Sequence, residues 1–489
     1  MIIEEKQQRN WKPIIKQFEA VLGKNGVVQR REELITYECD GLTSYRQRPG
    51  LVVLPRTTEQ VAEVVKICDR YSIPFIARGS GTGLSGGALP IEDCVLIVTS
   101  LMRQILSVDL DNQRVVVQPG VINNWVTQTV CGAGFYYAPD PSSQIICSIG
   151  GNVAENSGGV HCLKYGVTTN HVLGLKIVTP DGSIVDIGGQ IPEMPGYDLT
   201  GIFVGSEGTL GIATEITLRI LKSAESICVL LADFTTVEAA AESVSDIISA
   251  GIIPGGMEMM DNISINAVED VVATNCYPRD ATAILLVEID GLDVEVTANK
   301  QRVAEICLKN GARNITSASD LETRLKLWKG RKAAFAAAGH LSPDYYVQDG
   351  VIPRTQLPYV LQEIEALSQK YGYEIANVFH AGDGNLHPLI LFDNSIKGAL
   401  EKVEELGGEI LKLCVRVGGS ISGEHGIGAD KKCYMPDMFS EIDLETMQWV
   451  RQVFNPQGLA NPGKIFPTPR TCGEAASASK QQFEGVELF

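Results

Sequence analysis

The sequence of 489 residues predicts an α/β protein with two core-forming units, and two observations carry this prediction. Between about residues 46 and 224, short apolar strands are separated by three glycine-rich stretches. After residue 225, long helical patterns alternate with apolar strands. We therefore expect one unit at 46–224 and a second α/β unit at 225–467, preceded by an amphipathic helical lead-in at 1–45.

The elements of the first unit follow from local patterns. A helix is expected over 58–71, where Val61, Val64, Val65 and Cys68 share one face. Asp181-Gly182 predicts a hairpin between strands at 172–178 and 183–187. The other expected strands are 51–54, 73–77, 94–98, 113–117 and 214–220.

The second unit shows helical spacing and apolar strands in alternation. Its expected helices are 237–250, 293–309, 356–370 and 397–417, and its expected strands are 226–233, 282–289 and 374–378. The tail at 468–489 is short of apolar residues, which predicts disorder.

Charge and composition exclude several classes of protein. A net charge of −18 disfavours nucleic acid and anionic membranes as partners, and it means that an anionic substrate needs local positive charge. Residues 1–11 lack the apolar core of an export signal, and no apolar run is long enough to cross a bilayer. We therefore expect a cytoplasmic protein. None of the 12 cysteines forms a CxxC pair, which argues against an iron–sulfur centre in this chain.

The first glycine-rich stretch, at 78–87, contains a formal GxGxxG pattern. A dinucleotide-binding loop of the Rossmann type opens a helix, but here Ala88-Leu89-Pro90 and a strand follow, so we exclude a nicotinamide dehydrogenase. Successive backbone N–H groups can still form a concave nest for phosphate, helped by Arg78, Ser80 and Thr82. Further stretches at 139–159 and 204–212 favour a large, extended cofactor.

Four segments carry a family resemblance: PRTTEQV, RGSGTGLSGG, SIGGNVAENSGG and VGSEGTLGI. They resemble the FAD-binding (PCMH-type) domain of the vanillyl-alcohol-oxidase and p-cresol methylhydroxylase flavoproteins. Over about residues 45–467, the chain is most similar to the glycolate oxidase D-subunit and the FAD-dependent D-lactate dehydrogenases. The resemblance implies an FAD-binding domain followed by a substrate (cap) domain of the FAD-linked oxidase C-terminal type, whose C-terminal end returns to the flavin domain.

The resemblance also implies how FAD is held. Some members bind FAD through a histidine of the first loop, whereas this chain has Thr82 there, so non-covalent FAD is expected. The implied cofactor contacts are Arg78, Gly79, Ser80, Gly81, Thr82, Gly83, Pro139, Ser143, Gly150, Gly151, Asn152, Asn156, Gly158, Gly159, Glu207, Gly211, Ile212 and Asn461.

Three of the six histidines fall in two glycine-rich motifs, HAGDGNLH at 380–387 and GEHG at 423–426. Small residues between His380 and His387 allow both imidazoles to converge, and with Glu424 they can hold a divalent ion with open positions. The alternative is that these are hydrogen-bonded loop histidines. The resemblance implies that His380, His387 and Glu424 are metal ligands (Zn²⁺, Mn²⁺ or Fe²⁺), that His425 is the base, and that Asn385 lies near the substrate.

The implied activity is oxidation of a small 2-hydroxy acid, glycolate or D-lactate, by hydride transfer from C2 to flavin N5. Arg331 is the best candidate for the cation that anchors the carboxylate. A D-2-hydroxyglutarate-like substrate stays open, since Lys329, Lys332 or Arg354 could supply a second cation. Two further alternatives also stay open: an oxidase that uses oxygen directly, and an FAD-bearing electron-transfer subunit of a larger complex.

The electron acceptor must lie outside the chain, because no cysteine cluster is present to carry electrons onward. We expect a quinone or an iron–sulfur partner subunit, which would allow peripheral association with a membrane through that partner.

Overall fold

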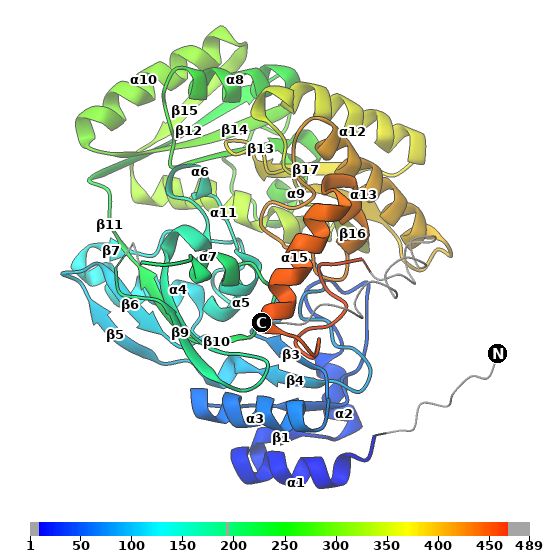
Figure 1. Ribbon diagram of the computed structural model, residues 1–489. Coiled ribbons are helices and arrows are strands. Elements are labelled where there is room, and N and C mark those ends of the chain that lie inside the picture. The colour runs from blue at the N-terminus through cyan, green and yellow to red at the C-terminus, as the bar shows by residue number, and fades with distance from the viewer. Residues whose placement is uncertain (1–8, 192–194, 468–489) are drawn as a thin grey trace.

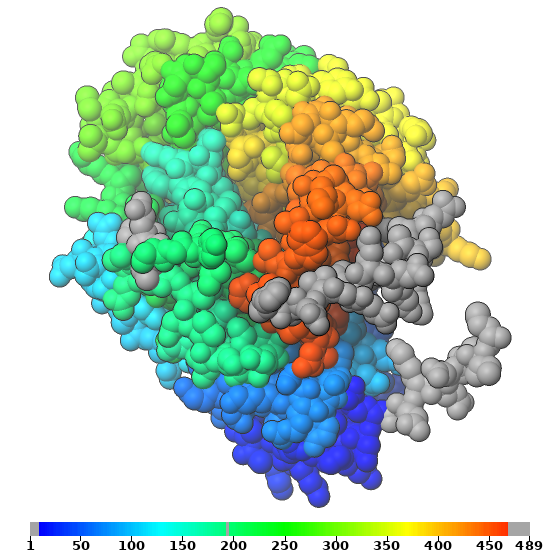
Figure 2. Space-filling model, in the orientation of Figure 1, coloured from blue at the N-terminus to red at the C-terminus, as the bar shows by residue number. Residues whose placement is uncertain are grey.

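The computed structural model describes residues 9–191 and 195–467, and it has the α/β fold class that the sequence predicts. The elements up to β11 form one lobe, apart from α6, which contacts β13, and those from β12 to α13 form the other (Figure 1). The two lobes pack closely in the space-filling view (Figure 2). The segment at 468–489, for which we predicted disorder, lies outside the described residues. Within the described ranges, no helix combines the length and apolar character needed to span a membrane.

The first sheet has the order β1 (Val27–Val28), β2 (Leu51–Val53), β4 (Val95–Val98) and β3 (Phe75–Arg78). Its last three strands are parallel. Helix α3 (Thr58–Arg70) begins where the Thr57 hydroxyl accepts a bond from the backbone of Gln60, and it packs against α1 (Trp11–Leu22). The lead-in is not purely helical, because Val27 and Val28 pair with β2, and the short α2 (Arg31–Leu34) follows them.

The second sheet is antiparallel, in the order β5 (Ile105–Asp109), β6 (Arg114–Val117), β10 (Ile212–Arg219), β8 (Val172–Val178) and β9 (Ile184–Gly188). The predicted hairpin is confirmed as β8 and β9. A small pair, β7 (Phe135–Tyr136) with β11 (Leu221–Lys222), lies beside it. The helices of this part are α4 (Asn123–Val130), α5 (Ile149–Glu155), α6 (Cys162–Tyr165) and α7 (Leu199–Phe203).

Part of the second glycine-rich stretch forms a helix, α5. Ile149 and Val153 anchor this short helix in the core. Gly150 allows it to approach the chain at Pro119, since a Cβ atom there would lie 2.6 Å from the Pro119 Cβ. The glycines therefore serve close packing of a helix as well as exposure of backbone.

The cap sheet has seven strands, all paired antiparallel. Its order is β15 (Ala312–Ala318), β12 (Ser226–Phe234), β14 (Ala283–Gly291), β13 (Gly256–Asp261), β17 (Ile375–His380), β18 (Pro388–Phe392) and β16 (Asp344–Val347). Alternate side chains of β12 enter two separate cores, as the two-residue period of a strand requires.

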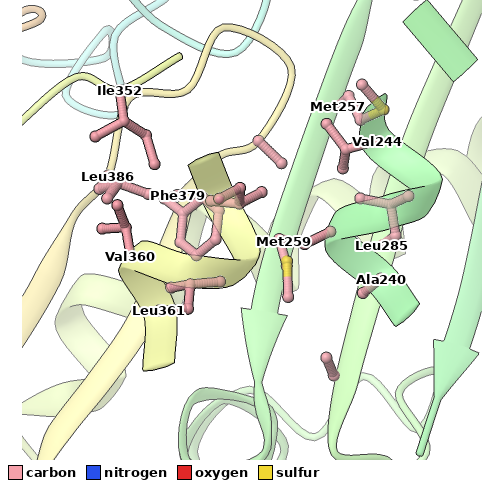
Figure 3. Close-up of a cluster of buried hydrophobic side chains, with 14 of the residues drawn as sticks. Ala240, Val244, Met257, Met259, Leu285, Ile352, Val360, Leu361, Phe379 and Leu386 are labelled. Carbon is pink, nitrogen blue, oxygen red and sulfur yellow. The ribbon is translucent and has the colours of Figure 1, made fainter. Parts of the chain in front are cut away.

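Helices cover both faces of the cap sheet. One core contains residues of α8 (Val237–Ser249), α10 (Asp293–Lys309), α12 (Leu357–Tyr371) and α13 (Ala399–Arg416). Figure 3 shows part of it, where Phe379 lies near Val360 and Leu361. The other core contains residues of α9 (Asn262–Val271) and α11 (Leu321–Ala338), which the sequence did not predict as helices.

The chain returns to the first sheet after α14 (Met435–Met438) and α15 (Glu441–Phe454), as the resemblance implied. The Phe75 N–H donates to the Leu459 carbonyl at 2.9 Å, and the Asn461 N–H donates to the Phe75 carbonyl at 2.8 Å. Residues 459–461 thus continue the edge of β3.

Candidate active site

A cavity of about 580 Å³ is lined by both lobes. This volume lies within the usual range for small-molecule and cofactor sites. Most of the predicted cofactor contacts line it: Arg78, Gly79, Ser80, Gly81, Thr82, Gly83, Ser143, Gly150, Gly151, Asn152, Glu207, Gly211 and Ile212. Glu424 and His425 line the same cavity, so all three glycine-rich stretches and the GEHG motif meet in one space.

The first two glycine-rich stretches are in direct contact. The Ser80 N–H donates to the Ser148 hydroxyl at 3.3 Å. A Cβ atom at Gly79 would lie 2.1 Å from that hydroxyl oxygen, and Gly81 adopts a φ of +72°. No helix follows β3 within residues 79–94, which are all described, so the exclusion of a Rossmann loop agrees with the structure. The glycines leave the backbone of this wall accessible to a phosphate group.

The other predicted cofactor residues, Pro139, Asn156, Gly158, Gly159 and Asn461, do not line the cavity but support its walls. The Asn461 amide donates to the carbonyls of Gly87 and Glu207, which joins the first stretch to the third. The Asn156 amide oxygen accepts from the Thr169 N–H at 2.9 Å. Gly158 faces Glu424, since a Cβ atom there would lie 2.8 Å from Oε2.

The three predicted metal ligands converge. Nε2 of His380 and Nε2 of His387 each lie 3.3 Å from Oε1 of Glu424. The ligand atoms of His380, His387 and Glu424 all lie within 4.8 Å of one another. The pair His380 and His387 ends β17 and precedes β18, so adjacent strands place the two rings together.

A carboxylate that the sequence did not single out orients His380. Glu258 stands opposite His380 in the β13–β17 register, and its Oε1 lies 2.7 Å from Nδ1 of His380. This contact leaves Nε2 facing Glu424. A carboxylate on the second ring nitrogen is the usual support of a metal-bound histidine.

Arg331 contacts the carboxylate oxygen of Glu258 that does not face His380. Its side chain is 1% exposed, and its Nε and Nη2 atoms contact Oε2 of Glu258 at 2.7 Å and 2.6 Å. The residues that line the cavity include the neighbouring Lys332 but not Arg331. The structure therefore brings Arg331 to Glu258, and its predicted contact with a substrate carboxylate stays a prediction.

The donor set fits a cation. Burial disfavours charge on His380, but Glu258 and Glu424 outweigh this effect and raise the pKa of His380 well above its ordinary value. Among the described residues, Nδ1 and Nε2 of His387 and Oε2 of Glu424 are buried without a hydrogen-bond partner. Imidazole nitrogens and a carboxylate oxygen left in this state suit a divalent ion.

His425 differs from the other two histidines. Its ring stacks on that of His387, with centroids 5.0 Å apart and planes 4° apart. Its backbone N–H donates to Asp349 at 2.9 Å, and Lys431 pairs with the same carboxylate at 3.1 Å. Burial lowers the pKa of His425 to about 4, which favours a neutral ring at the cavity wall.

Asn385 lies between the histidines, 5% exposed, against the GEHG loop. A Cβ atom at Gly423 would lie 2.6 Å from the Asn385 amide carbon. Its Oδ1 has no hydrogen-bond partner within the described parts of the chain. Asn385 therefore has an unpaired amide oxygen next to the GEHG loop, although it is not among the residues that line the cavity.

Comparison with known proteins fits this arrangement. Residues 49–188 match the FAD binding domain family, and residues 223–465 match the family of FAD linked oxidases, C-terminal domain. The chain is 52% identical over 448 residues to glycolate oxidase subunit GlcD of Escherichia coli (strain K12), covering 92% of this chain and 90% of that protein. The chain belongs to the FAD-linked oxidase family.

Other members of this FAD-linked oxidase family are also similar along most of their length. Glycolate oxidase subunit GlcD of Bacillus subtilis (strain 168) is 38% identical, covering 88% of this chain and 92% of that protein. A D-lactate dehydrogenase of Anaerostipes hadrus is 32% identical, covering 86% and 90%. This FAD-linked oxidase is therefore a flavin-dependent oxidoreductase of the family that contains these enzymes.

Solved structures show the fold. A 4-ethylphenol oxidase from Gulosibacter chungangensis superposes with a TM-score of 0.79 at 17% identity, covering 94% of this chain and 98% of that one. A p-cresol methylhydroxylase gives a TM-score of 0.77 at 16% identity, covering 93% and 96%. The PCMH-type architecture that the sequence resemblance implied is confirmed.

Proposed function

We propose that this flavoprotein catalyses the metal-dependent oxidation of a small 2-hydroxy acid, glycolate or D-lactate, to the 2-oxo acid. The observation that carries the proposal is that one cavity is lined by the glycine-rich stretches and by Glu424 and His425. When bound, non-covalent FAD supplies a hydride acceptor at N5, and a divalent ion (Zn²⁺, Mn²⁺ or Fe²⁺) supplies a Lewis acid for the hydroxyl and carboxylate oxygens.

The chain's own residues divide the remaining work. His380, His387 and Glu424 hold the ion, while Glu258 fixes the ring of His380. His425 lines the cavity with a neutral ring and takes the proton of the substrate hydroxyl. The Asn385 amide packs on Gly423, the residue before Glu424, and in this proposal it orients the substrate.

The substrate class is supported by the relatives. Proteins that resemble this chain over most of their length include ones named glycolate oxidase subunit GlcD and D-lactate dehydrogenase. Both substrates are 2-hydroxy acids that can present a hydroxyl and a carboxylate oxygen to one ion. Glycolate and D-lactate differ by one methyl group, so pocket size decides between them.

The electrons then pass to an acceptor outside this chain, a quinone or an iron–sulfur partner subunit. Two relatives carry the word subunit in their names, which supports an assembly of several chains. The sequence has no CxxC pair to ligate an iron–sulfur centre of its own.

A visible spectrum under anaerobic conditions tests the proposal. We expect an oxidised flavin spectrum that bleaches on addition of glycolate or D-lactate, with the faster acid identifying the preferred substrate. Treatment with a chelator should abolish bleaching while the FAD stays bound, and one of the three metals should restore it.

Two results would contradict the proposal in different ways. If no 2-hydroxy acid reduces the flavin after the metal is restored, the substrate assignment is wrong. Flavin that is still reduced at full rate after complete metal removal would leave the substrate but remove the metal.

A further inference from the structure

Helix α11 carries two neighbouring cationic side chains, Arg331 and Lys332, which lie in different surroundings. Arg331 turns toward β13, where Glu258 neutralises it. Lys332, Phe335 and Ala336 line the cavity, as residues spaced three and four apart on one helical face do. The side chain of Lys332 keeps 32% of its area exposed, whereas that of Arg331 keeps 1%.

Two sets of contacts place Lys332 near the proposed chemical end of the cavity. One helical turn further on, the ring of Phe335 packs against that of His387, with centroids 5.6 Å apart. On the other side, Lys332 Nζ lies 3.4 Å from Oδ2 of Asp140. The backbone of Asp140 packs on Gly159, whose neighbour Gly158 faces Glu424.

The cavity is short of positive charge. Glu155, Glu207 and Glu424 line it, while Arg78 and Lys332 are the arginine and lysine side chains among its described lining residues. Arg78 belongs to the first glycine-rich stretch, where its guanidinium donates to the Cys39 carbonyl and lies over the Tyr37 ring. Of these two cations, Lys332 is the one whose helix also packs on His387, and it lines the same cavity as Glu424 and His425, so it can meet an anion that must enter an acidic protein.

Asp140 does not depend on Lys332 alone. Its Oδ1 lies 3.0 Å from Nδ1 of His161 and also accepts from the His161 backbone N–H at 3.3 Å. Burial by itself would raise the pKa of Asp140, but His161 and Lys332 outweigh burial and bring it to about 2. The ammonium of Lys332 can therefore turn toward a second carboxylate while His161 still holds Asp140.

We propose that Lys332 is the cation that pairs with the substrate carboxylate in the cavity, and that Arg331 instead positions Glu258. This inference rests on the proposed oxidation of a 2-hydroxy acid and names a residue that selects for the acid. Lys332 then contributes to binding of the substrate and to its orientation toward His425, and it takes no part in proton or hydride transfer.

The test compares Lys332→Met, Lys332→Arg and Lys329→Met in the FAD- and metal-loaded protein. For Lys332→Met we expect KM for the preferred acid to rise about 10- to 100-fold, the usual cost of losing a charged hydrogen bond, with kcat within about three-fold. Lys332→Arg should recover most of the affinity. Lys329 lies exposed on the same helix, so Lys329→Met should behave as the unsubstituted protein.

A neutral analogue separates charge recognition from structure. With glycolamide or lactamide, flavin reduction in single turnover should be equally fast in the Lys332→Met variant and the unsubstituted protein. An unchanged KM for the acid in Lys332→Met would overturn the inference, and so would equal losses for acid and amide. If a 2-hydroxy acid reduces the flavin of the unsubstituted protein, either of these two results contradicts the role of Lys332 and leaves the proposed function standing. If no 2-hydroxy acid reduces the flavin of the unsubstituted protein, the proposed function is contradicted as well.

Arg331→Met provides the contrast on the same helix. If Arg331 positions Glu258, this variant should lose bound metal, measured by elemental analysis, because His380 loses its oriented support. Retention of the metal together with a large rise in KM would assign the carboxylate to Arg331 and contradict the inference.

Discussion

His387 and His425 stack ring on ring, yet their surroundings prepare them for different chemistry. His387 lies between carboxylates, with Nε2 3.3 Å from Glu424 and 3.5 Å from Asp349. His425 lies at the cavity wall, where burial favours the neutral ring. Replacing His425 by Asn should lower kcat about 10²- to 10⁴-fold, the usual contribution of a general base. Rapid-reaction measurement of flavin bleaching tests this.

Two quantities serve as controls for His425→Asn. Bound metal and the oxidised flavin spectrum should be unchanged, because the proposed ligands are His380, His387 and Glu424, whereas the second convergent group, Asp349, His387 and His425, is not the proposed site. Loss of metal in this variant would move His425 from base to ligand. Activity within a few-fold of the unsubstituted protein would remove it from the reaction.

Glu155 is a buried acid whose effect on the free energy of unfolding depends on pH. Among the described residues its Oε2 has no hydrogen-bond partner, and burial together with Glu207 raises its pKa well above the ordinary value. The folded state then keeps a proton that the unfolded chain releases near pH 4.3, so stability falls as pH rises above that value. Glu155→Gln should remove this loss.

We expect the Tm of the FAD-free Glu155→Gln variant to exceed that of the unsubstituted protein at pH 8, because the amide removes the cost of the buried carboxyl. The difference should vanish below about pH 4, where both states are protonated. Glu92→Gln, at an exposed position, serves as the control. A Tm difference that is constant from pH 4 to pH 8 would show that Glu155 does not titrate as described.

At the scale of elements, the turn between β17 and β18 brings His380 and His387, the two proposed metal ligands, together. Gly384 adopts a φ of +79°, and a Cβ atom there would lie 2.1 Å from the backbone carbonyl oxygen of Ile352. Since backbone cannot rotate away as a flexible side chain can, Gly384→Ala should displace this turn. We expect metal affinity to fall at least ten-fold while FAD binding is kept, measured by metal titration of the chelated protein.

Gly372→Ala is the matched control for the turn. Gly372 also has a positive φ, of +74°, but an added Cβ there meets no atom of the described chain within 4 Å. This variant carries the backbone strain without the clash, so its metal affinity should be unchanged. Equal loss in both variants would mean that overall destabilisation, and not the turn, controls the metal site.

The elements also show what sequence reasoning could reach. Helix α10 was predicted with the bounds it has, 293–309, because its pattern is regular. Helix α11 was not predicted. It buries Arg331 and Gly330 beside Leu327 and several alanines, so its buried positions do not show a regular apolar pattern. The predicted helices α3 and α8 bury mostly apolar residues, with one hydroxyl side chain each.

The same contrast holds for the site. The spacing of His380 and His387 was enough to predict convergence, since both residues belong to one short turn. Glu258 was missed, because its contact with His380 depends on strand register across 122 residues. A signal was present: Glu258 stands between Met257 and Met259 in the apolar part of its strand, and a charge in such a position requires a partner.

At the scale of the whole molecule, Asn461 joins walls of the cavity that lie far apart in the sequence. Its amide donates to the carbonyls of Gly87 and Glu207. Asn461→Ala leaves both carbonyls buried without this donor, so we expect a Tm lower by about 2–4 °C and FAD affinity reduced about ten-fold. Thermal unfolding and FAD titration of the apoprotein measure these effects.

Asn394→Ala, at an exposed position, is the control for Asn461→Ala and should change neither quantity. A fall in Tm with unchanged FAD affinity would confine Asn461 to fold stability. Unchanged values of both would show that the C-terminal return does not support the cavity.

The return of residues 459–461 to β3 also sets an order on biosynthesis. While the chain is being made, β1, β2, β4 and β3 can assemble early, but the free edge of β3 has no neighbour until residue 461 emerges, almost 400 residues after Phe75. An unpaired edge is a template for aggregation, so this lobe depends on protection during translation. The cavity whose walls Asn461 joins is likewise complete only after residue 461 has emerged, so we expect FAD to bind after that point.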